Sequence, residues 1–357
     1  MAYIEELVIL FVLLAVILFW KEKKSESFLS FRMTNEMKGL AILMVFLVHT
    51  QYGASLLMKC GGYGVGLFLF LSGYGLYQSN RLELANSANY IKKRLLKLLP
   101  SFFIYMAVFT VVWVLFPSVT YPVLGNHMPT SITSFIYDNF AFSPVWFILF
   151  ILFWYAVYYL AIKSSISKEY KIASLFLAGF LIVGLRPFES GPYWQPILEW
   201  FVYPFCFPLG VLISHRKEAV ENFLSTKAFI PVINRIALCL AIFLCVYLIT
   251  DAFSTTIHPT LPSPLTSALF VFGVLFLFYF FLKEHRSRFL SILGDVSYEL
   301  YFFHLLFLVV FIDFGQKYLW NNYLVSFFMA LVVSILASWA VKKTADYLVA
   351  RMSPIKC

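Results

Sequence analysis

The sequence has few charged residues and few cysteines, and both shortages exclude broad classes of protein. Only 13% of the 357 residues are Asp, Glu, Lys or Arg, about half the share of a typical soluble domain. The five cysteines form no Cys-x-x-Cys pair and no cluster with histidine, which argues against redox chemistry and a zinc site. His-Glu-x-x-His, Gly-x-Ser-x-Gly and P-loop patterns are also missing. We therefore expect no metal and no tightly bound cofactor.

Apolar residues make up 61% of the chain, and their long runs indicate an integral membrane protein. Runs that can cross about 30 Å of hydrocarbon predict eleven transmembrane helices in an all-α polytopic bundle. They lie at residues 3–20, 40–58, 63–79, 98–117, 145–162, 172–186, 197–213, 236–250, 265–282, 298–314 and 323–341. We expect an extra N-terminal anchor and basic linker at 1–31, a ten-helix core at 32–341 and a cytoplasmic tail at 342–357.

The 27 basic residues outnumber the 18 acidic ones, and their distribution indicates orientation. If successive connections alternate across the membrane, 24 of the 27 basic residues lie on one side. This bias marks the cytoplasmic side and predicts an N-terminus outside and a C-terminus inside. Because topology explains the positive charge, we expect membrane lipids as surroundings and no nucleic-acid partner.

The stretch KGLAILMVFLVH, residues 38–49, places Lys38 and His49 at the ends of an apolar run. Eleven residues correspond to about three helical turns and about 16 Å, so the two groups share a face and His49 lies near mid-membrane. A polar group there is costly unless it faces protein or water. A functional His49 would explain the arrangement. The alternative is that Lys38 extends its ammonium to the interface while His49 hydrogen-bonds a neighbouring helix.

A basic stretch marks the cytoplasmic start of the fourth span, in YIKKRLLKLLP, residues 90–100. Lys97 follows Lys93 by four residues and Arg94 by three, so it lies near both of them on a helix. Topology alone would explain these cations, but they also lie on the side where anionic metabolites are found. This group is therefore a candidate anion-binding site.

A second histidine occurs at the start of the tenth span, in GDVSYELYFFH, residues 294–304. Tyr298, Tyr301 and His304 recur every three residues and share one side of a helix. His304 lies about 14 Å along the helix from Asp295, a depth similar to that of His49. Two histidines at matching depth favour a proton-transfer function.

These stretches, in their order along the chain, resemble the motifs of integral-membrane acyltransferases of the acyltransferase-3 type. Lys38 and His49 match the family's Gly-Leu-Arg-Gly/Ala-Ile-Ala motif region, in which a histidine follows the arginine by eleven residues. GVGLFLFLSG, which contains Ser72, resembles the Gly-Val-Asp-Leu-Phe-Phe-Val-Leu-Ser-Gly signature. The basic stretch resembles Arg-Arg-Leu-Leu-Arg-Ile-Leu-Pro, and SYELYFFH resembles Ser-Tyr-x-x-Tyr-x-x-His. The similarity covers residues 32–341.

The chain also departs from the family pattern at several motif positions. Lys38 and Lys97 replace arginines, and a lysine offers a phosphate a point charge instead of a planar fork. Asn35, Gly66 and Ile151 stand where many members have an acid. The roles of those acids are not carried over, and the chain resembles a divergent branch.

The resemblance implies a bacterial cytoplasmic-membrane enzyme that moves an acyl group, commonly acetyl, from cytosolic acyl-CoA to a hydroxyl. The implied acceptor is a cell-envelope glycan or lipid-linked glycan. The phosphates of acyl-CoA would bind a cationic group, and His49 would be catalytic as a general base or a transient acyl carrier. The cations are Lys38, Lys93, Arg94 and Lys97, and Ser72, Tyr301 and His304 are candidate cavity-lining residues.

A transporter or flippase is the alternative, because polar groups at mid-depth in a multi-helix bundle also describe a translocation pathway. The sequence shows no inverted repeat and no matched pair of broken spans in two halves. The pattern therefore favours the enzyme.

Overall fold

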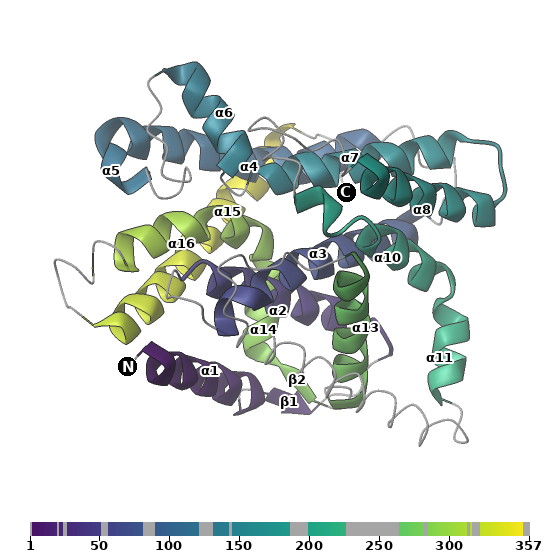
Figure 1. The fold of residues 1–357 in the computed structure, drawn as a ribbon, viewed down its shortest axis with the longest axis horizontal. Coiled ribbons are helices and arrows are strands. Elements are labelled where there is room, and N and C mark those ends of the chain that lie inside the picture. The colour runs from purple at the N-terminus through teal and green to yellow at the C-terminus, as the bar shows by residue number, and fades with distance from the viewer. Residues whose placement is uncertain are drawn as a thin grey trace. The chain divides into compact units, whose positions relative to one another are not determined.

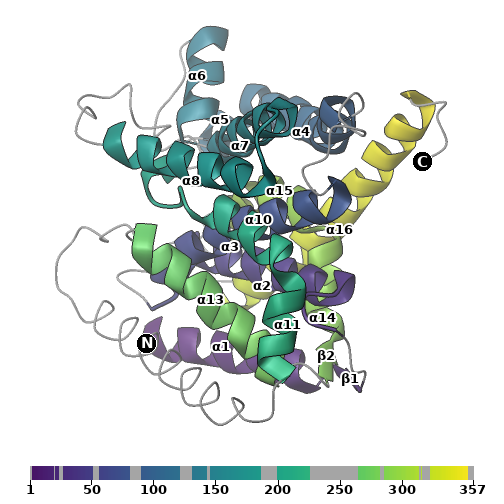
Figure 2. The same cartoon turned by 90° about the vertical axis from the view of Figure 1, so that its right-hand side faces the viewer.

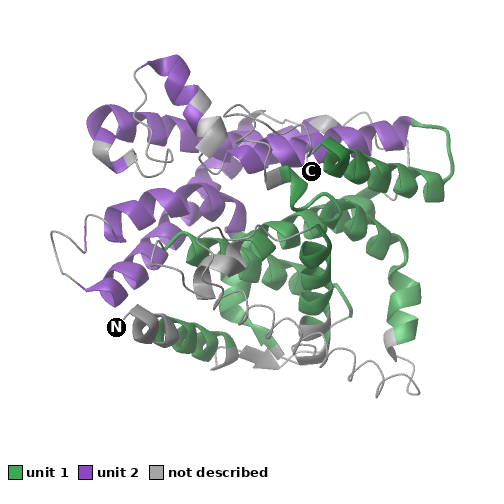
Figure 3. Cartoon of the chain, in the orientation of Figure 1, with its two compact units in different colours: residues 1–82, 164–188, 199–295 green, residues 83–163, 189–198, 296–357 purple. Residues whose placement is uncertain are grey.

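The computed structural model shows a mainly helical chain with two compact units (Figure 1). Unit 1 comprises residues 1–82, 164–188 and 199–295, and unit 2 comprises the remainder (Figure 3). The structure describes residues 2–19, 21–23, 27–50, 56–80, 90–120, 131–142, 145–185, 199–225, 264–281, 285–312, 315 and 322–352.

Four helices form the centre of unit 1, and glycines allow two of them to touch. They are α2 (Phe31–Val48), α3 (Leu56–Asn80), α10 (Cys206–His215) and α14 (Arg288–Asp295). Helix α2 packs between α14 and α3, and α3 also packs on α10. A Cβ atom on Gly39 of α2 would overlap the carbonyl oxygen of Leu290 in α14. The missing side chain is therefore what permits this close backbone approach.

The other elements of unit 1 surround this centre (Figure 2). They are α1 (Ala2–Phe19), β1 (Lys21–Lys23), α8 (Lys168–Leu185), η4 (Glu199–Phe201), α11 (Lys217–Ser225), α13 (Pro264–Phe281) and β2 (His285–Ser287). Strand β1 pairs antiparallel with β2, a short sheet that the all-α prediction omitted. Helix α1 contacts α14, and its Ile9 and Leu13 are buried. The predicted N-terminal anchor is thus packed into unit 1.

Unit 2 is built around aromatic side chains. Its helices are α4 (Tyr90–Leu115), α5 (Pro117–Thr120), α6 (Ile132–Phe142), α7 (Trp146–Lys163), α15 (Ser297–Leu308) and α16 (Tyr323–Met352). Tyr105 and Phe109 of α4 belong to the same buried cluster as Phe135 of α6 and Phe302 of α15. The Tyr105 and Phe302 rings stack with centroids 5.2 Å apart. This cluster fixes three helices of the unit against one another.

Three described helices are long and apolar enough to cross a membrane: Lys92–Leu115, Trp146–Lys163 and Tyr323–Arg351. The α14 and α15 pair would add a fourth if it counts as one span. These helices agree with an integral membrane protein. The total of eleven spans stays a prediction, and the span at 236–250 lies outside the described residues.

The second predicted span, 40–58, has the wrong limits. Helix α2 begins at Phe31, where the Ser30 hydroxyl caps it by accepting a hydrogen bond from the Met33 N–H at 3.2 Å. It ends at Val48, after which the Thr50 hydroxyl donates to the Leu47 carbonyl oxygen at 2.8 Å. His49 therefore caps the C-terminus of the helix instead of lying inside it.

Two further boundaries differ from the prediction. The helix expected to join Asp295 to His304 is interrupted at Val296, whose φ of −114° and ψ of 13° depart from helical values. The estimate of 14 Å along one continuous helix was therefore wrong. At the other end, residues 342–352 continue α16 although the sequence assigned them to the tail.

Candidate functional site

The structure divides the predicted site residues between the two units. Lys38, His49 and Ser72 belong to unit 1, whereas Lys93, Arg94, Lys97, Tyr301 and His304 belong to unit 2. All eight are among the described residues.

His49 lies half-buried at the end of α2, with its ring orientation fixed by the backbone. Its Nδ1 atom is 2.8 Å from the carbonyl oxygen of Val45, one turn earlier. A carbonyl oxygen can only accept a hydrogen bond, so Nδ1 carries the proton and Nε2 carries the lone pair. This is the tautomer that a general base acting through Nε2 requires.

Lys38 and Ser72 are the other predicted site residues of unit 1, and both are half-buried. Lys38 lies in α2 between the buried Met37 and Gly39, while Ser72 lies in α3 between the buried Leu71 and Gly73. Neither packing environment by itself assigns a chemical role to the side chain.

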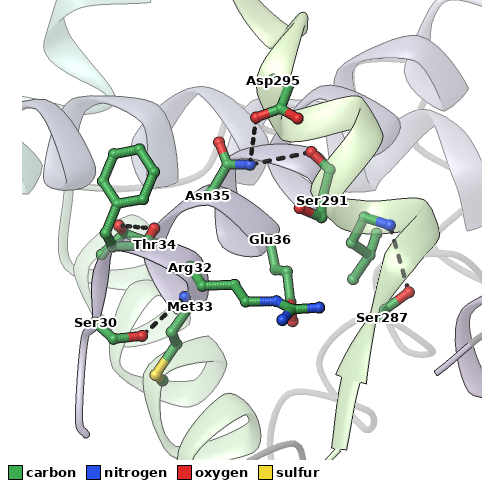
Figure 4. A network of polar contacts seen from close by, with 11 residues as sticks. Ser30, Arg32, Met33, Thr34, Asn35, Glu36, Ser287, Ser291 and Asp295 are labelled. Carbon is green, nitrogen blue, oxygen red and sulfur yellow. Dashed lines mark hydrogen bonds and ion pairs between the residues drawn. The ribbon is translucent and has the colours of Figure 1, made fainter. Parts of the chain in front are cut away.

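A polar network in front of Lys38 ties α2 to α14 (Figure 4). The Asn35 amide donates to the Ser291 carbonyl oxygen at 3.0 Å and to Asp295 Oδ1 at 2.9 Å. An ionised acid at position 35 would repel Asp295, whereas asparagine bonds to it. Where many family members have an acid, this chain has Asn35, which donates a hydrogen bond to a carboxylate, Asp295, on the neighbouring helix.

A second polar pair lies one residue further along α2. Arg32 Nε and Glu36 Oε1 are 3.6 Å apart, and Glu36 is fully buried. Such a pair at i and i+4 stabilises a helix, and removal of one partner of a buried pair is costly. The start of α2, which leads into Lys38, is therefore held both within the helix and against α14.

His304 in unit 2 has the same ring arrangement as His49. Its Nδ1 atom is 2.7 Å from the Tyr301 carbonyl oxygen, which again leaves the lone pair on Nε2. Both side chains are buried, and the Tyr301 ring lies 5.1 Å from the Phe147 ring between centroids. These two predicted lining residues are thus packed inside unit 2.

Arg94, one of the cations of α4, lies beside a group of tyrosines. The Arg94 guanidinium lies 5.9 Å from the centre of the Tyr90 ring, which is within the range of a cation–π interaction. The Tyr90 hydroxyl donates to the Tyr155 carbonyl oxygen at 3.4 Å, and its ring stacks on Tyr159 with centroids 5.8 Å apart. Arg94 is therefore oriented by the docking of α4 on α7.

Lys93 and Lys97 are both exposed on α4. Lys97 interacts electrostatically with Arg94, with Lys342 of α16 and with Glu299 of α15. The sequence motif predicted the first neighbour but neither of the other two, because they come from helices more than 200 residues away. Within unit 2, Lys97 therefore has charged neighbours on α15 and α16 as well as on α4.

Glu299 is the buried carboxylate of this group. The Ser101 hydroxyl donates to its Oε1 atom at 2.8 Å, and both side chains are buried. One turn earlier on α4, the Leu98 carbonyl oxygen accepts from the Tyr298 hydroxyl at 2.9 Å. One feature of the sequence could have indicated that Ser101 belongs with the cations. Arg94 and Ser101 differ by about 20° around the helix axis, so both side chains lie on the same side of α4.

A third polar cluster, which the motifs did not indicate, lies in unit 1 where α3 and α10 end. The Tyr77 hydroxyl hydrogen-bonds His215 Nδ1, and His215 Nε2 is 3.9 Å from Glu169 Oε1. Burial lowers the pKa of His215 from its ordinary value, and the neighbouring Arg216 lowers it further. Local pairing explains this cluster without a ligand.

The described residues contain no group of three or more His, Cys, Asp or Glu side chains that could hold a metal ion. The membrane-length apolar helices define the class of the protein, which is a helical integral membrane protein.

The comparison with protein families is more specific. Residues 35–343 match the model of the acyltransferase-3 family, described as an acyltransferase domain. The match covers most of the chain, so the protein belongs to this family, which implies membrane acyltransferase activity. Its limits lie close to the predicted core at 32–341. Neither the curated proteins nor the solved structures gave a significant match.

Proposed function

We propose that this protein transfers an acetyl group from cytosolic acetyl-CoA to a hydroxyl of a cell-envelope glycan or lipid-linked glycan. The match of residues 35–343 to the acyltransferase family carries this proposal. We place the enzyme in a bacterial cytoplasmic membrane, with the N-terminus outside and the C-terminus in the cytoplasm. The distribution of basic residues supports this orientation.

The proposed donor-binding group is the cationic side of α4. Coenzyme A carries phosphate charges that a planar guanidinium can bind through two parallel hydrogen bonds. Arg94, oriented over Tyr90, supplies such a fork, and the exposed Lys97 supplies a point charge one turn away. Lys93 and Lys38 are assigned supporting positive charge from the sequence motifs.

The proposed base is His49 through Nε2. It takes the proton from the acceptor hydroxyl as the hydroxyl oxygen bonds to the acyl carbon. The bond from that carbon to sulfur then breaks, and the proton on Nε2 passes to the leaving thiolate. The Val45 carbonyl oxygen, 2.8 Å from Nδ1, holds the ring in place and stabilises the imidazolium that forms between these steps.

The alternative chemical route makes Nε2 the nucleophile. The acyl carbon would first bond to Nε2 with loss of coenzyme A, and the hydroxyl would then attack the acyl-imidazole. Acid quenching of the protein with labelled acetyl-CoA in the absence of acceptor distinguishes the routes. Label retained on the wild type and absent from His49→Gln indicates the covalent route.

The function is tested with purified protein in liposomes, labelled acetyl-CoA outside and candidate glycans present on either side. Protein-free liposomes and reactions without acceptor are the controls. We expect label to become covalently attached to the glycan only when protein and acceptor are both present. If acetyl-CoA stays intact while a solute crosses the membrane, the protein is a transporter and the proposal is wrong.

A further inference from the structure

A lysine outside every sequence motif lies in the cationic group of unit 2. Lys342 is half-buried in α16, in the segment that the sequence analysis assigned to a cytoplasmic tail. Helix α16 packs on both α4 and α15 within unit 2. This packing brings Lys342 into electrostatic interaction with Lys97 and with Glu299.

The charges in this group do not balance one another. Arg94, Lys97 and Lys342 contribute three positive charges, and the buried Glu299 contributes one negative charge. Asp346, one turn after Lys342, also acts on Glu299 and adds a second negative charge, so the three cations exceed the two carboxylates by one charge. Like charges brought together disfavour each other's ionised form. A bound anion would relieve this repulsion.

The buried carboxylate explains how the cations are held near one another. Glu299 is fixed by the Ser101 hydroxyl at 2.8 Å, and Ser101 is one turn from Lys97 on α4. The carboxylate therefore occupies a defined position from which it attracts Lys97 and Lys342 at the same time. The exposed end of Lys97 and the half-buried Lys342 can then meet a ligand from solvent.

We infer that Lys342 is a third cation of the donor site and binds a phosphate group of acyl-CoA together with Arg94 and Lys97. The inference rests on the proposed function, because it assumes that acyl-CoA is the donor. It adds a residue of α16 to the cations of α4, and it gives the last helix of the family domain a role in substrate binding.

Lys343 provides a matched control for Lys342. It is adjacent in sequence, exposed, and its ammonium lies 5.2 Å from the centre of the Trp339 ring. Each lysine is changed to glutamine in the full chain, and coenzyme A binding is measured by calorimetry in detergent or nanodiscs. A thermal melt of each variant checks that the fold is retained.

Lys342→Gln should weaken coenzyme A binding about fivefold to tenfold, as expected for one partly exposed charged contact. Lys343→Gln should stay within about twofold of wild type, and Lys342→Arg should recover most of the affinity. The difference between the two glutamine variants should shrink at high salt.

Three other outcomes would overturn the inference. If Arg94→Gln weakens binding while Lys342→Gln does not, the donor site exists but excludes Lys342. If both lysine variants weaken binding equally, the effect is general positive charge and the specific contact is wrong. If the folded wild type does not bind coenzyme A at all, the inference fails together with the proposed function.

Discussion

Replacement of Arg94 by glutamine tests the donor site through the donor dependence of the reaction. The change keeps a long polar side chain on α4 but removes the charge and the planar fork over Tyr90. A hydrogen bond to a charged group contributes about 1.5–3 kcal/mol. Since each 1.4 kcal/mol is tenfold, we expect the KM for acetyl-CoA to rise about 10-fold to 100-fold. The same bond is present in the ground state and the transition state, so kcat should change little.

Arg94→Lys separates charge from geometry in the same assay. Lysine keeps the positive charge but offers no bidentate fork, so its KM should lie between those of wild type and Arg94→Gln. Lys92→Gln, which removes an exposed cation from the same helix, serves as the control and should be close to wild type. Initial rates are measured over a range of acetyl-CoA concentrations at saturating acceptor. An unchanged KM, or an equal loss for Lys92→Gln, would refute the assignment.

Three further predictions concern unit 1. Asn35→Leu removes donors to Ser291 and Asp295 and should lower the free energy of unfolding by about 2–4 kcal/mol, measured by denaturation in detergent. Gly39→Ala places a Cβ atom against the Leu290 carbonyl oxygen and should cost about 1–3 kcal/mol in the same measurement. Because the pKa of His215 is lower in the folded protein than its usual 6.5, the unfolded state takes up more protons as pH falls through 6.5, and the thermal midpoint should fall with it.

Each of these predictions has a control within the chain. Thr34→Ala removes a hydroxyl that bonds only locally to the Phe31 carbonyl oxygen, so an equal loss there would contradict the Asn35 reasoning. Gly75→Ala adds a Cβ atom with no neighbour within 4 Å, and it should be harmless where Gly39→Ala is not. His215→Gln should flatten the pH dependence of the midpoint, and an unchanged slope would mean that another group is responsible.

Long apolar runs predicted several helices well because a helix that is apolar along its whole length leaves a strong signal. The runs at 145–162 and 265–282 correspond closely to α7 and α13. Hydropathy was a poorer guide to helix ends, which depend on local hydrogen bonds. The cap at Ser30 and the break at Val296 are single-residue features that an apolar run does not reveal.

The proximity of Arg94 and Lys97 was predictable because both lie on α4, three residues apart, whereas their function stays a prediction. Proximity was not predictable where packing joins distant segments, because no spacing in the sequence relates Lys97 to Lys342 or Ser101 to Glu299. The predicted depth of His49 in the membrane also does not reveal which of its ring nitrogens carries the proton. The decisive detail for His49 is the bond from Nδ1 to the Val45 carbonyl oxygen, which sets the tautomer.

The central claim is that His49 is the catalytic base for acyl transfer from acyl-CoA. The most direct measurement compares wild type and His49→Ala in two assays on the same preparation, acetyl transfer to acceptor and binding of coenzyme A. We expect His49→Ala to bind coenzyme A within about twofold of wild type and to lose at least about 100-fold in turnover, the usual contribution of a general base. Turnover close to that of wild type in a folded His49→Ala protein would contradict the account.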